Sequence, residues 1–136
     1  MVKFYECKHC GQIIEMVNDS FVPVTCCGEQ MVEMVPNTSD GAGEKHVPVA
    51  TVEGNTVKVN VGAVDHPMVD AHYIPWVVLE TCCGVYRKAL KPGDAPTVTF
   101  TFGDEKPVAV YAYCNLHGLW KTELLFLHKR REISFS

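Results

Sequence analysis

The sequence lacks long apolar runs and an excess of positive charge. Of its 136 residues, 47% are hydrophobic and 21% are charged, yet no run approaches the roughly 18 apolar residues that a membrane-spanning helix needs. It has 12 Lys and Arg residues and 16 Asp and Glu residues, so its formal net charge is -4. Because nucleic-acid-binding domains usually carry a basic surface, we expect neither a nucleic acid nor a membrane as a partner.

A secretory signal is also missing. The first seven residues contain neither an apolar core nor a small-residue cleavage site. We therefore expect a cytoplasmic protein, whose thiols stay reduced. The seven cysteines of such a chain favour metal binding over disulfides, and their odd number agrees, because a set of bridges would leave one thiol over.

Patterns typical of helices are nearly absent, and strand patterns dominate beyond residue 44. There, β-branched and aromatic residues form short runs that turn residues separate. Seven strands are predicted, over residues 47–53, 56–61, 73–80, 85–90, 97–102, 108–114 and 120–126. This spacing is typical of a seven-stranded, immunoglobulin-like antiparallel β-sandwich. The chain is therefore predicted to be all-β.

The first 36 residues have a different character. They hold short strand-like pieces at residues 12–17 and 31–35, and such a small piece usually needs a metal or a bridge for stability. A stretch rich in Gly, Pro, Ser, Asn and Asp follows at residues 36–43. We therefore predict a metal-stapled β module at residues 1–36 and the sandwich domain at residues 37–136.

Four cysteines form an early cluster. Cys7-x-x-Cys10 is a knuckle that can bind one ion, and the adjacent pair Cys26-Cys27 follows after fifteen residues. A vicinal pair should distort the tetrahedron more than a second knuckle would. Zinc and iron both tolerate that distortion, so the spacing leaves open a zinc staple without redox work.

The later cluster contains four histidines and a single thiol. Its members are His46, His66, His72, Cys114 and His117. A lone histidine is more often a loop or core residue than a ligand. Together, however, these side chains lie at predicted loops and strand ends, which can meet at one rim of a sandwich. Mixed imidazole and thiolate ligation suits a reactive ferrous ion with a sixth position for a small ligand.

Several motifs of the chain carry a family resemblance. They are Glu44-Lys45-His46-Val47-Pro48-Val49, His66-Pro67-Met68, His72, Lys91-Pro92-Gly93-Asp94-Ala95-Pro96 and Cys114-Asn115-Leu116-His117-Gly118. Over about residues 5 to 121 the chain resembles desulfoferrodoxin, the two-iron superoxide reductase family. The resemblance implies two iron ions per chain, one Fe(Cys)4 and one Fe(His)4Cys. It also implies one-electron reduction of superoxide to hydrogen peroxide, a rubredoxin-like electron donor and a homodimer.

The same resemblance assigns individual residues. Cys7, Cys10, Cys26 and Cys27 would hold the first iron, with His46, His66, His72 and His117 as equatorial ligands and Cys114 as the axial ligand of the second. Glu44 would be a sixth ligand in the oxidised state, and Lys45 a cationic guide for superoxide. From the residues alone, Glu44 and Lys45 would be a solvated charge pair on a mobile loop.

Other interpretations stay open. The chain could be an electron carrier that uses only the Fe(Cys)4 centre, or a zinc-stapled binding module without catalysis. Cys82-Cys83-Gly84 repeats the Cys26-Cys27-Gly28 tripeptide, and we interpret it as a hairpin turn with incidental thiols, against a vicinal disulfide or an intersubunit link. Residues 124–136 could extend an edge strand or a dimer contact, and their basic run is predicted to be a solvated end.

Overall fold

The computed structural model describes residues 1–124, and the chain divides into two compact units, Met1–Val35 and Pro36–Ser136. The predictions for residues 125–136, including the end of the seventh strand and the basic run, lie outside the described residues. No helix within residues 1–124 is long and apolar enough to cross a membrane.

The first unit is a pair of small antiparallel sheets. One sheet has the order β2-β1-β5, with β1 at Phe4–Glu6, β2 at Ile13–Glu15 and β5 at Val32–Glu33. The other joins β3 (Thr25–Cys26) to β4 (Glu29–Gln30). The predicted pieces at residues 12–17 and 31–35 contain β2 and β5. So few buried side chains, chiefly Phe4, Met31 and Met34, are a small core for a folded unit, which favours a metal staple.

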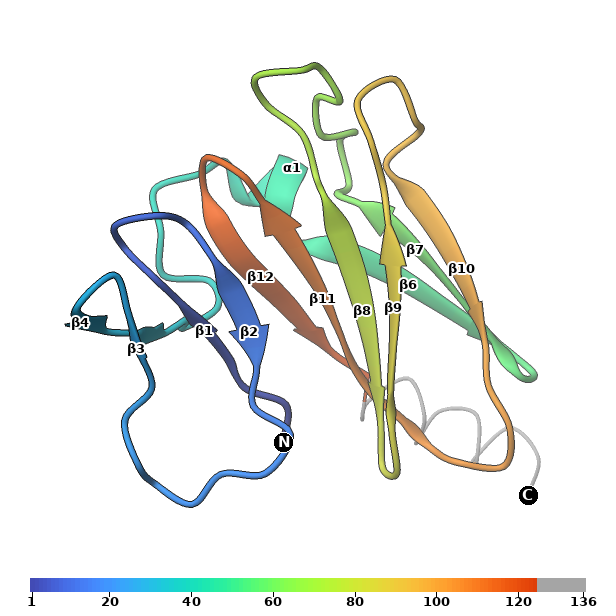
Figure 1. Cartoon of the computed structure of the whole chain (residues 1–136). Coiled ribbons are helices and arrows are strands. Elements are labelled where there is room, and N and C mark those ends of the chain that lie inside the picture. The colour runs from blue at the N-terminus through green and yellow to red at the C-terminus, as the bar shows by residue number, and fades with distance from the viewer. Residues whose placement is uncertain (125–136) are drawn as a thin grey trace. The chain divides into compact units, whose positions relative to one another are not determined.

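The second unit is an antiparallel sandwich, as predicted. Its strands are β6 (Pro48–Glu53), β7 (Thr56–Val61), β8 (Trp76–Thr81), β9 (Val85–Ala89), β10 (Thr97–Thr101), β11 (Pro107–Cys114) and β12 (Gly118–Glu123). They form a three-stranded sheet, β10-β7-β6, and a four-stranded sheet, β12-β11-β8-β9 (Figure 1). Each of the seven predicted ranges overlaps one of these strands.

Alternating apolar side chains place the core between the two sheets. In β7, Val57, Val59 and Val61 are all fully buried, and they pack in one cluster with Leu79 and Phe100. A strand whose every second residue is apolar buries one face, which is why these segments form half-buried strands.

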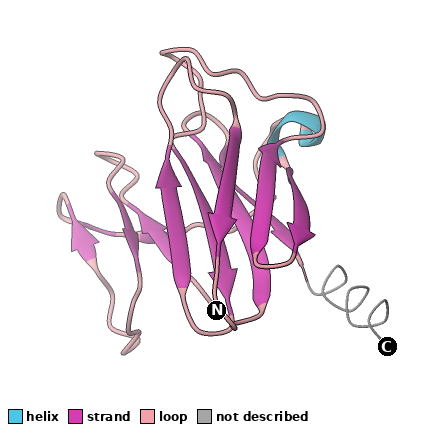
Figure 2. Cartoon of the chain, turned by 90° about the vertical axis from the view of Figure 1, so that its right-hand side faces the viewer, coloured by secondary structure: helices cyan, strands magenta, loops and turns pink. Residues whose placement is uncertain are grey.

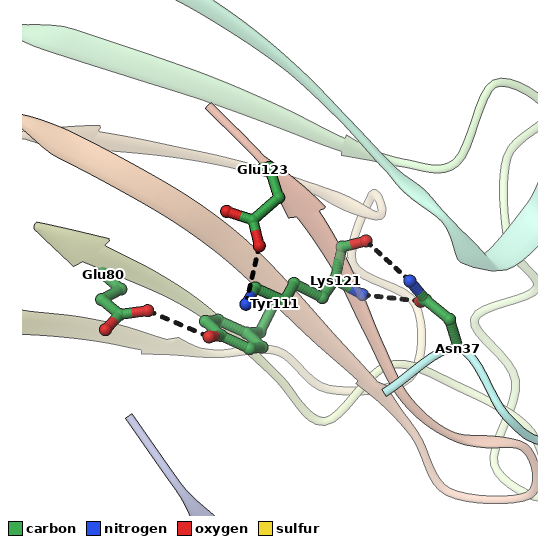
Figure 3. A network of polar contacts seen from close by, with 5 residues as sticks. All are labelled: Asn37, Glu80, Tyr111, Lys121 and Glu123. Carbon is green, nitrogen blue, oxygen red and sulfur yellow. Dashed lines mark hydrogen bonds and ion pairs between the residues drawn. The ribbon is translucent and has the colours of Figure 1, made fainter. Parts of the chain in front are cut away.

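Side-chain hydrogen bonds connect two strands of the four-stranded sheet and attach Asn37 to a third (Figure 3). The Tyr111 hydroxyl of β11 donates to Glu80 of β8 at 2.9 Å. The Asn37 side chain pairs with the backbone of Lys121 in β12, donating to its oxygen at 3.2 Å and accepting from its nitrogen at 2.9 Å. Asn37 thereby fixes the chain that leads to the next element.

That element is a one-turn helix, α1 (Gly43–His46), the single helix of the described residues (Figure 2). The expectation of a loop at Glu44 and Lys45 is therefore wrong. The Ala42 carbonyl accepts from the backbone N–H groups of Lys45, at 3.0 Å, and His46, at 3.1 Å, which closes the turn.

His72, expected at the start of the strand predicted over residues 73–80, lies outside any strand. It pairs with Val69 in an isolated bridge, and β8 begins only at Trp76. Pro75 explains the late start, because proline has no N–H to donate to a strand ladder. The Cys82-Cys83-Gly84 turn, in contrast, joins β8 to β9 as predicted.

Candidate metal centres

Five elements bring the histidine cluster together at one end of the sandwich. His46 ends α1, His66 follows β7, His72 precedes β8, Cys114 ends β11, and His117 lies in the turn between β11 and β12 (Figure 1). The ligand atoms of His46, His72, Cys114 and His117 all lie within 4.8 Å of one another. His66 joins them, because its Nε2 is 3.2 Å from the Nε2 of His46. All five predicted side chains are therefore gathered.

Hydrogen bonds define which ring nitrogens are free to bind a metal. His46 Nδ1 lies 2.8 Å from the Ala42 carbonyl, and His66 Nδ1 lies 2.7 Å from the Pro67 carbonyl. Because a carbonyl can only accept, both Nδ1 atoms donate and both Nε2 atoms keep their lone pairs. The close approach of these two Nε2 acceptors needs a cation between them to be favourable.

One further ring nitrogen of the cluster lacks a partner in the described part of the chain. His72 Nε2 is buried and has no hydrogen-bond partner among residues 1–124, which is rare for a buried polar atom. His117 Nδ1 lies 3.1 Å from His46 Nε2 and 3.7 Å from the Cys114 sulfur. The ring nitrogens and the Cys114 sulfur lie within metal-binding distance of one another, so the cluster fits a metal ion.

Burial sets the protonation states that a metal would meet. It lowers the pKa of His46, His66 and His72, that of His66 to about 4. These imidazoles are therefore neutral at pH 7, as ligands must be. Burial raises the pKa of Cys114, which is 0% exposed, so its thiolate depends on a bound cation.

Asn115 is a positioning residue that the sequence reasoning did not single out, although it stands inside the Cys114 motif. Its side-chain oxygen accepts from the Tyr73 N–H at 2.9 Å, and its side-chain nitrogen donates to the Ala71 carbonyl at 3.1 Å. Asn115 thus hydrogen-bonds the backbone on both sides of His72 and fixes that segment to the end of β11.

Trp120 was missed as well. Its ring lies 5.0 Å from that of His46, and its Nε1 donates to the His117 carbonyl at 3.1 Å. Gly41 allows this packing, since a Cβ there would lie 3.0 Å from the Trp120 ring and 3.2 Å from the His46 ring. A single tryptophan in a strand carries no signal of this role in the sequence.

Glu44 and Lys45 lie beside the cluster, on α1. Glu44 is exposed and Lys45 is half-buried. The positive charge of Lys45 contributes, after burial and the other histidines, to the lowered pKa of His72. Gly62 packs against the backbone of this turn. A Cβ at Gly62 would lie 2.8 Å from the Glu44 carbonyl oxygen and 2.9 Å from that of Val47, so a larger residue would not fit without a shift.

The four early cysteines also converge. The sulfur atoms of Cys7, Cys10, Cys26 and Cys27 all lie within 4.8 Å of one another, with Cys10 and Cys26 at 3.7 Å and Cys26 and Cys27 at 4.0 Å. Metal–sulfur bonds of about 2.3 Å in a tetrahedron require sulfur–sulfur edges of about 3.8 Å. The two distances at Cys26 are close to this value, so the vicinal pair fits a tetrahedral site with less distortion than its spacing predicts.

The thiols of this cluster share protons that a metal would replace. A hydrogen bond from the Cys10 backbone N–H lowers the pKa of Cys7 to about 6. The pKa of Cys26 is raised to about 12, mainly by its hydrogen bond with Cys10. Cys7 is therefore the thiol that ionises most easily, whereas Cys26 holds its proton. A bound cation would stabilise the thiolate form of both.

A small four-cysteine unit followed by an antiparallel sandwich with a four-histidine, one-cysteine cluster defines a protein with two non-haem metal centres. The desulfoferrodoxin family model matches residues 38–123, which is more than half of the chain. The chain therefore belongs to the desulfoferrodoxin family. The four-cysteine and four-histidine, one-cysteine sites match the two iron centres of that family, so the protein has two iron centres.

Similar proteins cover nearly the whole chain. It is 49% identical over 121 residues to a desulfoferrodoxin from Nitratidesulfovibrio vulgaris, covering 89% of this chain and 95% of the relative. It is 46% identical over 123 residues to a desulfoferrodoxin homolog from Archaeoglobus fulgidus, covering 90% and 97%. The solved superoxide reductase from Treponema pallidum matches with a TM-score of 0.75 at 37% identity, covering 90% of this chain and 98% of that one.

Proposed function

We propose that the protein is a superoxide reductase, which converts superoxide to hydrogen peroxide by one-electron reduction at the histidine-rich iron centre. The ligands would be His46, His66, His72, His117 and Cys114. The observation that carries the proposal is the convergence of four imidazoles and one buried thiol, among which the buried His72 Nε2 has no hydrogen-bond partner within residues 1–124. Relatives that are themselves named superoxide reductases support the same reaction.

The side chains would make the site attractive to a small anion. A ferrous ion held here supplies the electron. Burial keeps three of the imidazoles neutral, so one thiolate is the only negative ligand and a ferrous site would keep a net positive charge. Lys45 adds a further positive charge beside it. His72 and His117 are only half-buried, so superoxide and the two protons of the reaction can arrive from that side.

Cys114 would be the shielded ligand of the site. The Cys114 thiol is fully buried, which keeps its sulfur away from oxidants in solution. Its sulfur accepts a hydrogen bond from the His117 N–H at 3.3 Å, which favours the thiolate form. The Cys114 thiolate would supply electron density to an iron bound there, which would favour loss of an electron from that iron.

We assign Lys45 as the cationic guide for superoxide and Glu44 as the ligand of the oxidised centre. Both lie on the turn that ends at His46, and Glu44 is exposed. The Glu44 carboxylate would be the group that binds an oxidised iron there.

We further infer that residues 1–36 act as the Fe(Cys)4 module, with Cys7, Cys10, Cys26 and Cys27 as ligands, and residues 37–136 as the catalytic domain. A rubredoxin-like protein is the proposed electron donor, and a homodimer in the cytoplasm the proposed working form.

The test is a product balance on the reduced, iron-loaded protein mixed with pulsed superoxide. One hydrogen peroxide should form for each superoxide consumed, with no oxygen released. An electron carrier without the second reaction would leave superoxide to decay at its spontaneous rate. A zinc-stapled binding module would be colourless and would also leave superoxide to decay at its spontaneous rate.

A further inference from the structure

A second pair of neighbouring cysteines lies outside both metal clusters. Cys82 and Cys83 form, with Gly84, the turn between β8 and β9, at the end of the sandwich opposite α1 (Figure 1). Both thiols are exposed, and their sulfur atoms are 3.1 Å apart. Within residues 1–124, neither belongs to a group of three or more potential metal ligands. The pair is therefore available for chemistry between the two thiols.

The turn holds these thiols in place through its backbone. The Thr81 hydroxyl accepts from the N–H groups of Cys83, at 3.2 Å, and Gly84, at 3.0 Å. The Cys82 N–H donates to the Lys106 carbonyl at 2.8 Å, and the Lys106 N–H donates to the Cys82 sulfur at 3.4 Å. Cys82 is thus anchored on both its backbone and its sulfur, which limits the motions that would separate the two thiols.

The two thiols have different acidities. The hydrogen bond with Cys83 and then the Lys106 N–H lower the pKa of Cys82, while partial desolvation and the nearby Glu105 carboxylate act in the opposite direction. The same hydrogen bond raises the pKa of Cys83. Cys82 is therefore the more ready nucleophile, and Cys83 is a protonated thiol beside it. A low-pKa, exposed thiol next to a resolving thiol is the arrangement that peroxide oxidises.

We propose that Cys82 and Cys83 form a peroxide-reactive dithiol, which hydrogen peroxide converts reversibly to a vicinal disulfide. The Cys82 thiolate attacks one peroxide oxygen, the O–O bond breaks, and hydroxide leaves, so that Cys82 becomes a sulfenic acid. The Cys83 sulfur then attacks the Cys82 sulfur, the S–O bond breaks, and water leaves. In total, two thiols and one hydrogen peroxide give one disulfide and two waters. The oxidant is the product of the function proposed above.

Geometry favours easy reversal of this disulfide. Neighbouring Cα atoms lie about 3.8 Å apart across a trans peptide, which is below the usual range of about 4.4 to 6.8 Å for disulfides. Strained, exposed disulfides are more readily reduced than structural ones. An external dithiol reductant would return two electrons and two protons, restore both thiols and allow a further round of peroxide reduction.

The test adds hydrogen peroxide directly to the reduced, iron-loaded protein. Free thiols are then alkylated, and the peptide containing Cys82 and Cys83 is followed by mass spectrometry. We expect this peptide to escape alkylation, to have lost two hydrogens, and to regain both thiols with a dithiol reductant. Cys83→Ser should instead give a sulfenic acid at Cys82 that a cyclic diketone traps, and Cys82→Ser should react at least about tenfold more slowly.

Equal alkylation of both thiols before and after peroxide would overturn the proposal, as would irreversible oxidation of Cys82 without a disulfide. Because the peroxide is supplied from outside, the result does not depend on superoxide reduction. A protein that forms the disulfide but leaves superoxide untouched would remove the proposed function alone. A protein that reduces superoxide but keeps both thiols would remove the dithiol alone.

Discussion

Lys45 adds one positive charge beside a cluster of neutral rings in a chain that is acidic as a whole. Salt screens charges beyond about 8 to 10 Å, so the net charge of -4 matters less to an arriving anion than the side chain next to the site. The influence of Lys45 on the pKa of His46 and His72 places its charge within effective range of the centre.

We expect Lys45→Ala to lower the second-order rate of superoxide consumption by roughly tenfold and to weaken its dependence on salt, because local steering is lost. Lys45→Arg, which keeps the charge, is the matched control and should stay close to wild type. Stopped-flow or pulsed-superoxide kinetics measure both effects. An unchanged rate and salt dependence in Lys45→Ala would remove the steering role.

Glu44 provides a contrast on the same helical turn. Glu44→Ala should alter the visible spectrum of the oxidised histidine centre, because the proposed sixth ligand is lost, and should leave the superoxide encounter rate within about twofold of wild type. A slowed encounter with an unchanged spectrum would reverse the roles assigned to the two residues.

At the scale of elements, the site depends on how loops are tied to strand ends. β11 delivers Cys114 in a regular ladder, whereas His72 lies in an irregular segment with one isolated bridge. Asn115 joins the two, through its contacts with Ala71 and Tyr73. Groups that orient metal ligands in this way usually affect metal affinity strongly.

Asn115→Ala should therefore weaken iron binding at the histidine centre by roughly tenfold or more, with the Fe(Cys)4 spectrum unchanged. Asn115→Asp keeps an acceptor for the Tyr73 N–H but loses the donor to Ala71, so it should fall between wild type and Ala. Competition with a chelator, followed through the spectrum of each centre, measures the effect. Identical affinity in all three proteins would contradict the positioning role.

The difference between predicted and unpredicted elements has a physical cause. The seven sandwich strands could be predicted because alternating burial leaves a period-2 pattern in the sequence, as in Val57, Val59 and Val61. α1 could not, since it is a single turn of four residues and carries no apolar period. β1, which no prediction covered, is only three residues long.

The candidate site also contains residues that the sequence predicted and residues that it did not. The donors could be predicted from residue type, spacing and family resemblance, and the structure gathers all of them. Asn115, Trp120 and Gly62 act through distances across the fold, which a sequence pattern does not contain. Their roles are visible only in the folded structure.

For the whole sandwich, the buried pair of Tyr111 and Glu80 links stability to alkaline pH. Burial, and next the hydrogen bond to Glu80, raise the pKa of Tyr111 above its usual range. The unfolded chain therefore ionises this tyrosine first, near pH 10, and the folded state loses stability as the pH rises beyond that value.

Tyr111→Phe should be less stable than wild type at pH 8, by about 1 kcal/mol, because a buried hydrogen bond is lost. The difference should narrow above pH 10, since Phe cannot ionise in the unfolded chain. Urea unfolding at pH 8 and pH 10.5 compares the two proteins. A difference that widens with rising pH would contradict the assignment.

The central claim is that five side chains from separate loops and strand ends act on one iron. The most direct measurement is the spectrum, metal content and superoxide consumption of Cys114→Ser. We predict loss of the long-wavelength thiolate-to-iron band and of superoxide reduction, with the Fe(Cys)4 spectrum intact. Superoxide reduction at the wild-type rate in Cys114→Ser would contradict the account.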